Sequence, residues 1–197
     1  MTSPDPTKLA QLFEKFPLLY PTLTKLNQHN IAWMIGGSGC LFLFGNERPP
    51  GDVDILIRNS QHDVVDEIFK IKSFTYSSPT ENVRNSNPEG NHDIQFTSHL
   101  ELSIESQKYS FDYGAPAIQQ KVSEVTFHDQ IVRIAPPEEA LLVKALLQRG
   151  EAEEKHDVED IQNFLELYDS LDRNYLESRI TRLNAQDRTA GIFLWLR

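Results

Sequence analysis

The chain has 197 residues and a formal net charge of −10 at pH 7. Its length suits one compact domain with a helical extension, and its acidity weighs against a large nucleic-acid partner, which usually requires a basic patch. No apolar run approaches the roughly 20 residues that span a bilayer, and the first residues lack the pattern of a secretory signal, so no membrane partner is expected. Cys40 is the only cysteine, which excludes an intrachain disulfide and a cysteine-rich metal site, and the expected location is cytoplasmic.

The first half of the chain predicts helices that alternate with short strands. Apolar residues recur at helical spacing after Asp5, whereas the pattern over residues 53–57 is typical of a strand. Residues 77–91 are polar and rich in turn-forming types, so they are predicted to form a mobile loop. The other elements expected here are a helix ending near Phe16, a helix after Pro21, a strand over residues 31–35, a helix over 39–44, a loop over 46–51 and a helix over 62–71.

The second half predicts two hairpins followed by helices. Strand-like runs over residues 94–104 and 109–113 are separated by a short polar turn, and a second hairpin is expected over residues 125–134. A proline pair and two acids then open a long helix that Gly150 stops, because proline and acidic side chains favour the first turn of a helix. Further helices are expected from there to Trp195.

This order of elements predicts an α/β (α+β) fold, with a small mixed sheet flanked by helices. Residues 1–135 are expected to form the core with its N-terminal helices. Residues 136–197 are expected to form a helical C-terminal section packed on that core.

Two aspartates on the predicted strand carry the first chemical signal. Asp52 and Asp54 alternate with Val53 and Ile55, so both carboxylates point to one face while the apolar residues point to the other. Two carboxylates on one face repel each other unless a cation lies between them. Mg²⁺ is held by one or two carboxylates together with substrate phosphates, so this pair predicts a site for Mg²⁺ or Mn²⁺.

A glycine turn supplies the second signal. Gly36, Gly37 and Ser38 stand between a predicted strand and a predicted helix. Glycines allow the backbone to approach a phosphate closely, and the free N–H groups of a helix start point toward such an anion. Gly-Gly-Ser alone usually marks a turn and Asp-x-Asp alone usually marks a solvated strand, but the two together predict a site for a metal-bound triphosphate.

The segment from Ile35 to Ile57 resembles the signature of the nucleotidyltransferase superfamily, in which a glycine turn after one strand precedes Asp-x-Asp on the next. Within that superfamily the chain resembles the small bacterial branch of AbiEii-type toxins and lincosamide and aminoglycoside nucleotidyltransferases. Three further features match that branch: Arg48, the stretch from Ile134 to Glu139 followed by Lys144, and the stretch from Lys155 to Ile161.

The resemblance implies a polymerase-beta-like fold and an enzyme that moves a nucleoside monophosphate from a nucleoside triphosphate to a hydroxyl acceptor. It implies that Asp52 and Asp54 hold the metal, and that Gly36, Gly37, Ser38, Arg48 and Lys144 contact the nucleotide. The acceptor is a small molecule, a protein or an RNA end. The alternative function is a non-catalytic nucleotide-binding or regulatory module of the same fold. A biological role as part of a toxin–antitoxin pair is a further hypothesis.

Members of the family also have a third carboxylate, for which Asp112 is the predicted residue. If Glu105 pairs with Lys108 across the first hairpin, the apolar faces of its two strands match and Glu101 lies opposite Asp112. Like charges directly opposite each other are destabilising unless a cation compensates them. Glu101 is the reserve candidate, and Asp93, at the start of the strand, is the third choice.

Overall fold

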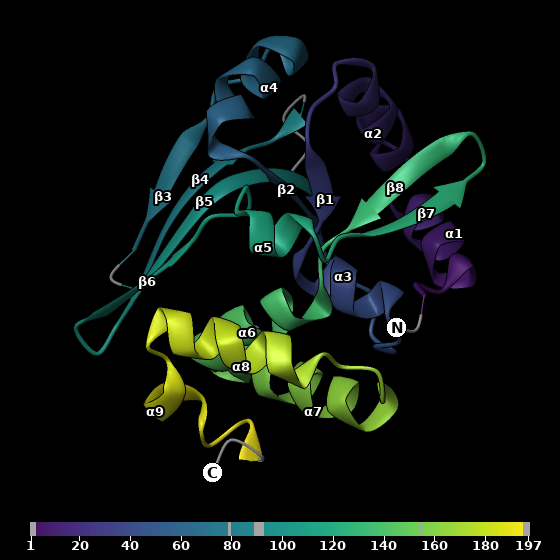
Figure 1. Ribbon diagram of the computed structural model, residues 1–197. Coiled ribbons are helices and arrows are strands. Elements are labelled where there is room, and N and C mark those ends of the chain that lie inside the picture. The colour runs from purple at the N-terminus through teal and green to yellow at the C-terminus, as the bar shows by residue number, and fades with distance from the viewer. Residues whose placement is uncertain (1–2, 79, 89–92, 154, 195–197) are drawn as a thin grey trace.

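The computed structural model describes residues 3–78, 80–88, 93–153 and 155–194. Its elements follow the chain in an order that mixes helices and strands from the beginning (Figure 1). The first half contains α1 (Pro6–Lys15), α2 (Leu19–Gln28), β1 (Trp33–Ile35), α3 (Gly37–Leu43), β2 (Val53–Ile57), the 3-10 helix η1 (Asn59–Gln61), α4 (His62–Phe69), β3 (Phe74–Ser77) and β4 (Glu81–Ser86). The second half contains β5 (Ile94–Ile104), β6 (Gln107–Phe111), α5 (Pro116–Gln119), β7 (Ser123–Phe127), β8 (Gln130–Ile134), α6 (Pro137–Leu147), the 3-10 helix η3 (Glu151–Glu153), α7 (Asp157–Leu167), α8 (Arg173–Leu183) and α9 (Gln186–Thr189).

One mixed sheet carries the strands, in the order β3-β4-β5-β2-β1-β8-β7. β2 pairs antiparallel with β1 and parallel with β5, and β1 pairs parallel with β8. The predicted α/β fold is therefore confirmed. Because β2 is interior, its apolar side chains are buried, and Val53 and Ile55 have no exposed surface.

Strand β5 is long enough to pair with two strands, β2 and β6, along the same edge. Its first part pairs with β2, from Ile94 opposite Val53 to Thr97 opposite Leu56. Its last part pairs with β6, from Leu100 opposite Phe111 to Ile104 opposite Gln107. The chain that leaves β6 therefore returns toward β2, and this brings Tyr113 to the same cavity as Asp54.

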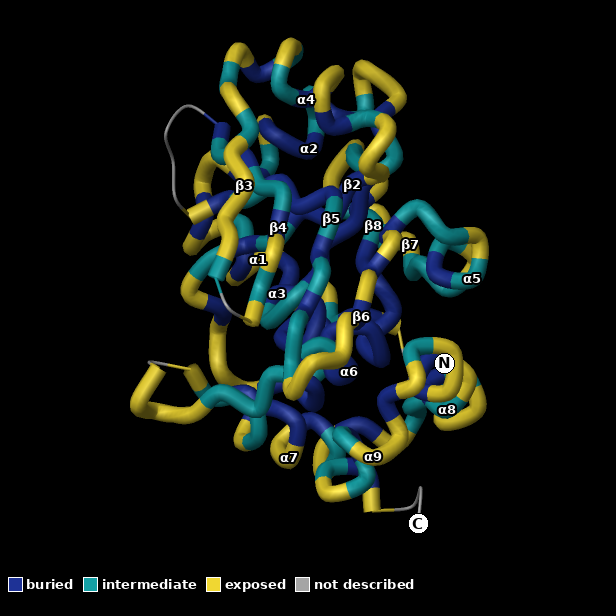
Figure 2. Tube along the Cα trace, turned by 90° about the vertical axis from the view of Figure 1, so that its left-hand side faces the viewer, coloured by how far each residue is buried: buried dark blue, intermediate teal, exposed yellow. Residues whose placement is uncertain are grey.

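The C-terminal helices form a group below the sheet in the view of Figure 1, with α6 at its centre. α6 packs against α3 and against α7, α8 and α9, so it is buried on most sides, as its dark tube in Figure 2 shows. Apolar residues explain this placement, since Leu141, Leu142 and Leu146 are fully buried. The predicted division at residue 135 remains a prediction.

Two expectations about secondary structure are corrected. The predicted loop over residues 77–91 is wrong for Glu81–Ser86, which forms β4 between β3 and β5, while residues 79 and 89–91 of that loop lie outside the described residues. β4 was missed because its residues are mostly polar and show little apolar alternation. The expected helical tail ends with α9 at Thr189, and Trp195 lies outside the described residues.

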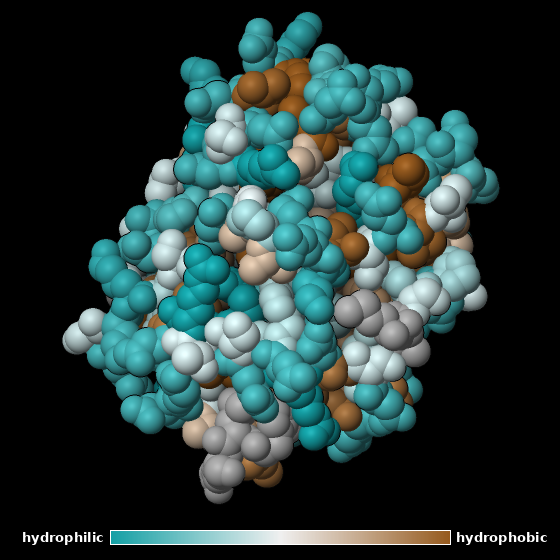
Figure 3. Space-filling model, viewed as in Figure 1, coloured by the Kyte–Doolittle hydropathy of each residue, from teal (hydrophilic) through white to brown (hydrophobic). Residues whose placement is uncertain are grey.

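The hydrophilic character of the surface agrees with the composition, in which 24% of the residues are charged. On the face drawn in Figure 3, hydrophilic residues predominate and apolar residues form small separate patches. Among the described residues, none of the helices has both the length and the apolar character needed to cross a membrane.

Candidate active site

The glycine turn between β1 and α3 is shaped by the strand beside it. Gly36 donates its N–H to the Asp54 carbonyl oxygen at 2.8 Å, and a Cβ atom on Gly36 would lie 2.4 Å from the Leu56 side chain. Gly37 has φ +54°, and a Cβ atom there would lie 2.1 Å from Asp54 Oδ2. Any larger residue would displace Leu56 or Asp54. The turn and the aspartate strand are therefore one interlocked unit, in which Asp54 lies directly against the backbone of Gly37.

Asp52 directly precedes β2 and Asp54 is its second residue, and both line a cavity of about 510 Å³. Burial and then the negative charge of Asp52 raise the pKa of Asp54 to about 6. The structure thus holds Asp54 in surroundings that disfavour its charge. A bound cation would relieve this cost, because an opposite charge stabilises the ionised carboxylate.

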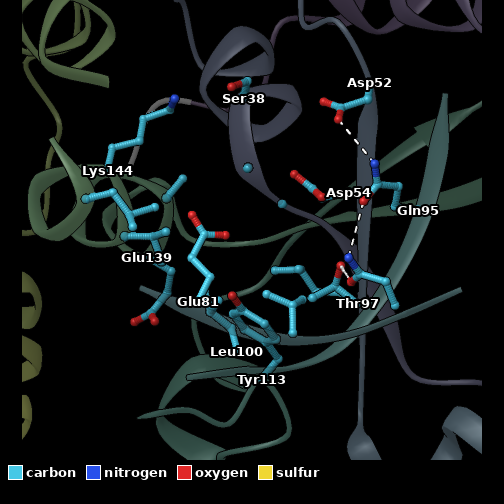
Figure 4. A pocket seen from close by; sticks show the side chains of 18 of the residues that line it. Ser38, Asp52, Asp54, Glu81, Gln95, Thr97, Leu100, Tyr113, Glu139 and Lys144 are labelled. Atoms are coloured by element: carbon cyan, nitrogen blue, oxygen red, sulfur yellow. Dashed lines mark hydrogen bonds between the residues drawn. The ribbon is translucent and has the colours of Figure 1, made fainter. Parts of the chain in front are cut away.

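Polar side chains of β5 and β4 form the floor of the cavity beside the two aspartates. Figure 4 labels Gln95 and Thr97 among them. Gln95 Nε2 donates to Asp52 Oδ2 at 3.4 Å, and Gln95 is the strand partner of Asp54. Asn85 Nδ2 donates to Gln95 Oε1 at 3.5 Å, and Thr97 Oγ1 donates to Asn85 Oδ1 at 2.8 Å. These contacts link the aspartates to β4. These contacts could not be predicted from the sequence, because a Gln and an Asn on polar strands have no recognisable motif.

Three cationic side chains line the cavity, but two of them are engaged by acids. Lys144 Nζ lies 3.0 Å from Asp157 Oδ1 and 2.9 Å from Asp160 Oδ2. Arg149 Nε lies 2.8 Å from Asp157 Oδ2. Lys155 also lines the cavity, and its charge acts on Asp54; within the described ranges its side chain has no ion pair.

The ion-pair cluster on α6 and α7 is buried. Asp157 and Asp160 are almost fully buried, and although burial opposes it, the hydrogen bonds and charges of Arg149 and Lys144 hold the pKa of Asp157 below its usual value. Arg48 pairs with Asp160 and does not belong to the cavity lining. The structure therefore places the predicted nucleotide contact Arg48 in the cluster rather than in the cavity, and it places Lys144 in both.

A second buried acid group closes the side of the cavity formed by α6. Glu139 lines the cavity, where Figure 4 shows it opposite the strand of Asp52 and Asp54. Both of its oxygens are occupied, because Arg179 donates to them at 2.6 and 2.9 Å and Tyr175 Oη donates to Oε1 at 2.7 Å. Burial raises the pKa of Tyr113, which lies nearby, and the charges of Glu139 and Asp54 raise it further. Sequence reasoning missed Tyr113 because only the fold of β5 and β6 brings it here.

The structure does not bring Asp112 to the two aspartates. Asp112 is exposed, it follows the end of β6 between the buried Phe111 and Tyr113, and its Oδ1 accepts a hydrogen bond from Gly114 N at 2.9 Å. It does not line the cavity. In the part of the chain that the structure describes, no three His, Cys, Asp or Glu side chains are grouped to hold a metal.

The predicted register of the first hairpin is wrong by two residues. Its turn lies at Glu105 and Ser106, which have φ of 49° and 68°, so Ile104 pairs with Gln107. Glu101 therefore faces Ser110 instead of Asp112, and Lys108 Nζ lies 2.9 Å from its carboxylate. The repulsion that motivated a cation near Asp112 does not exist.

Comparison with known proteins identifies the family of this chain. Residues 43–196 match the family described as "Uncharacterised nucleotidyltransferase". The chain belongs to this nucleotidyltransferase family. The resemblance inferred from the sequence is confirmed, and this protein is an enzyme of the nucleotidyltransferase class, for which nucleotidyl transfer is the general activity.

Solved structures show that this nucleotidyltransferase shares its fold with distant relatives. The TM1012 protein of Thermotoga maritima, assigned to the nucleotidyltransferases, is 16% identical, with a TM-score of 0.53 over 78% of this chain and 93% of that chain. The antibiotic-resistance factor ANT(2'')-Ia is 12% identical in its solution structure, with a TM-score of 0.54 over 93% of this chain and 96% of that chain. The structure of ANT(2'')-Ia in complex with adenylyl-2''-tobramycin is 13% identical, with a TM-score of 0.53 over 88% and 99%. Among curated proteins, none matches the sequence of this chain.

Proposed function

We propose that this nucleotidyltransferase is metal-dependent and transfers a nucleoside monophosphate from a nucleoside triphosphate to a hydroxyl acceptor. The observation that carries the proposal is the contact between Gly37 and Asp54 at one end of a cavity of about 510 Å³. A phosphate-binding turn and a metal-binding carboxylate would then act on the same triphosphate. Cavities of about 300–1,000 Å³ are typical of small-molecule sites.

The residues fit a hard divalent cation such as Mg²⁺ or Mn²⁺. Asp52 and Asp54 supply carboxylate oxygens, which these ions prefer, and a bound cation would offset the burial and the charge of Asp52 that raise the pKa of Asp54. When bound, the ion would supply positive charge that neutralises the phosphates and lowers the barrier to attack at the α-phosphorus. With only two acids from this chain in place, phosphate oxygens would complete the coordination.

Other residues orient the phosphates. The backbone N–H groups of Gly37 and Ser38 and the Ser38 hydroxyl are available as donors to phosphate oxygens. Lys155 is the cation best placed to add charge, because Lys144 is held by two buried carboxylates. As the acceptor oxygen bonds to the α-phosphorus, the bond from that phosphorus to the bridging oxygen breaks and pyrophosphate leaves. We therefore replace Arg48 and Lys144 with Lys155 as the proposed phosphate contact.

Asp93, the third candidate for a further acid, is exposed and does not line the cavity, although the register that pairs Val53 with Ile94 makes it the strand neighbour of Asp52. The proposal therefore assigns no catalytic role to Asp93.

Incubation with each of the four α-labelled nucleoside triphosphates, Mg²⁺ and a cell extract tests the function itself. We expect label to be transferred to an acceptor with release of pyrophosphate, and we expect the transfer to stop with EDTA or in Asp54→Asn. Binding of nucleotide by the parent protein without any transferred label, across extracts, would favour the non-catalytic module.

A further inference from the structure

The cavity has a second end, formed by aromatic side chains on the edge strand β3. Phe74 and Tyr76 line it, and 49% and 51% of their surface is exposed. They are two residues apart on the strand, so both point to the cavity face while Thr75 points to the other. In Figure 2 the tube of β3 is exposed along its length, in contrast to the strands behind it. Half-exposed aromatic rings beside a cavity leave a flat apolar surface open to a ligand.

Two rows of side chains connect these rings with the glycine turn. In one row Tyr76 pairs with Val83, and Val83 pairs with Leu100. In the other row Phe74 pairs with Asn85, Asn85 with Thr97, and Thr97 with Leu56, the residue on which Gly36 packs. All of these side chains line the cavity. The floor is therefore continuous from β3 to the site of the two aspartates.

The two ends of this floor differ in chemistry. Asp52, Asp54 and Lys155 place charge at the end near α3. The rings of β3 lie at the other end, and the apolar side chains Val143 and Leu147 of α6 also line the cavity, as does the ion pair of Glu81 and Arg149. A nucleoside triphosphate has the same division, because it is charged at one end and has a flat ring at the other.

We propose that Phe74 and Tyr76 form a stacking platform for the base of the nucleoside triphosphate. The inference rests on the proposed function, since that function places the phosphates at the aspartate end. β3 lies three strand positions from β2, which is about 14 Å at about 4.8 Å per strand. That distance is comparable to the separation between the phosphates and the base in an extended nucleotide. One nucleotide would then span the cavity, and the acceptor would enter from its open side.

Binding measurements with two kinds of probe test the platform. The probes are the Mg²⁺ complexes of ATP, GTP, CTP and UTP, and that of inorganic tripolyphosphate, which has the charge but no base. The proteins are the parent, the double variant Phe74→Ala/Tyr76→Ala, the ring-preserving Tyr76→Phe, and Thr75→Ala as a control on the opposite face of the same strand. Each variant must retain the parent's melting profile, as expected for half-exposed residues.

We expect the double variant to bind the preferred nucleotide about 5- to 150-fold more weakly, the range for the loss of base stacking on aromatic rings. Its affinity for tripolyphosphate should not change, and Tyr76→Phe and Thr75→Ala should resemble the parent. Unchanged nucleotide affinity in the double variant would overturn the platform and leave the proposed function intact. An equal loss for tripolyphosphate would also overturn it, because stacking cannot affect a ligand without a base. A parent protein that binds neither probe would overturn the proposed function.

Discussion

Replacing Asp54 with Asn should stabilise the metal-free protein and abolish its response to metal and nucleotide. The pKa of Asp54 is raised from 3.8 to about 6, first by burial and then by the charge of Asp52. The folded state therefore binds the proton of Asp54 more tightly than the unfolded chain does. The charged carboxylate therefore lowers the free energy of unfolding above pH 6. This loss of stability disappears as the pH falls toward 3.8.

The size of the effect follows from the shift. A difference of about 2 pKa units corresponds to about 3 kcal/mol at pH 8, of which about half remains at pH 5. Local relaxation reduces this cost, so we expect Asp54→Asn to raise the free energy of unfolding by about 1–3 kcal/mol at pH 8. For a protein of this size that is an increase of about 2–10 °C in melting temperature, and the gain should be smaller at pH 5.

Thermal unfolding with EDTA at pH 8 and pH 5, and again with Mg²⁺ and nucleoside triphosphate at pH 8, measures both parts of the prediction. The parent should gain about 2.7 kcal/mol from ligand at 100 times its dissociation constant, and Asp54→Asn should gain little. Asp112→Asn is the matched control, because it makes the same change at an exposed acid outside the cavity. A metal-free variant that melts below the parent at pH 8, or one that keeps the full response to ligand, would refute the reasoning.

Three further substitutions probe the same site. Gly37→Ala should destabilise the protein by at least about 1–2 kcal/mol, the cost of a left-handed backbone, and should reduce nucleotide binding by displacing Asp54, whereas Gly51→Ala, with open space around it, should change neither in a thermal-shift titration. Lys144→Met should lower the free energy of unfolding in urea by about 1–3 kcal/mol, because it removes the cation that two buried carboxylates share and leaves Arg149 and Arg48 as their remaining partners; no measurable loss would contradict that. Lys155→Gln should instead keep the melting temperature and weaken the binding of tripolyphosphate–Mg²⁺, and unchanged binding would remove Lys155 from the phosphate site.

The hairpin of β5 and β6 shows where a pattern of apolar residues stops being informative. The predicted register and the observed one differ by two residues, and both place apolar side chains opposite apolar side chains, because strand faces repeat every two residues. The observed register follows from the turn at Glu105 and Ser106. Both residues have positive φ values, which the ordinary preferences of Glu and Ser do not predict. That difference decided against Asp112 as an acid of the site.

The chemistry near Asp54 could be predicted from the order of residues along the chain. Strand alternation places Asp52 and Asp54 on one face whatever the rest of the fold does, and the positive φ of Gly37 favours glycine through local backbone geometry. The other residues that join this pair depend on how distant elements pack. Strand β4 is polar and forms through pairing with β5, and Lys144 is engaged by acids that follow it by 13 and 16 residues on another helix. Such contacts depend on how elements pack, and local sequence does not encode the partner of a side chain across that distance.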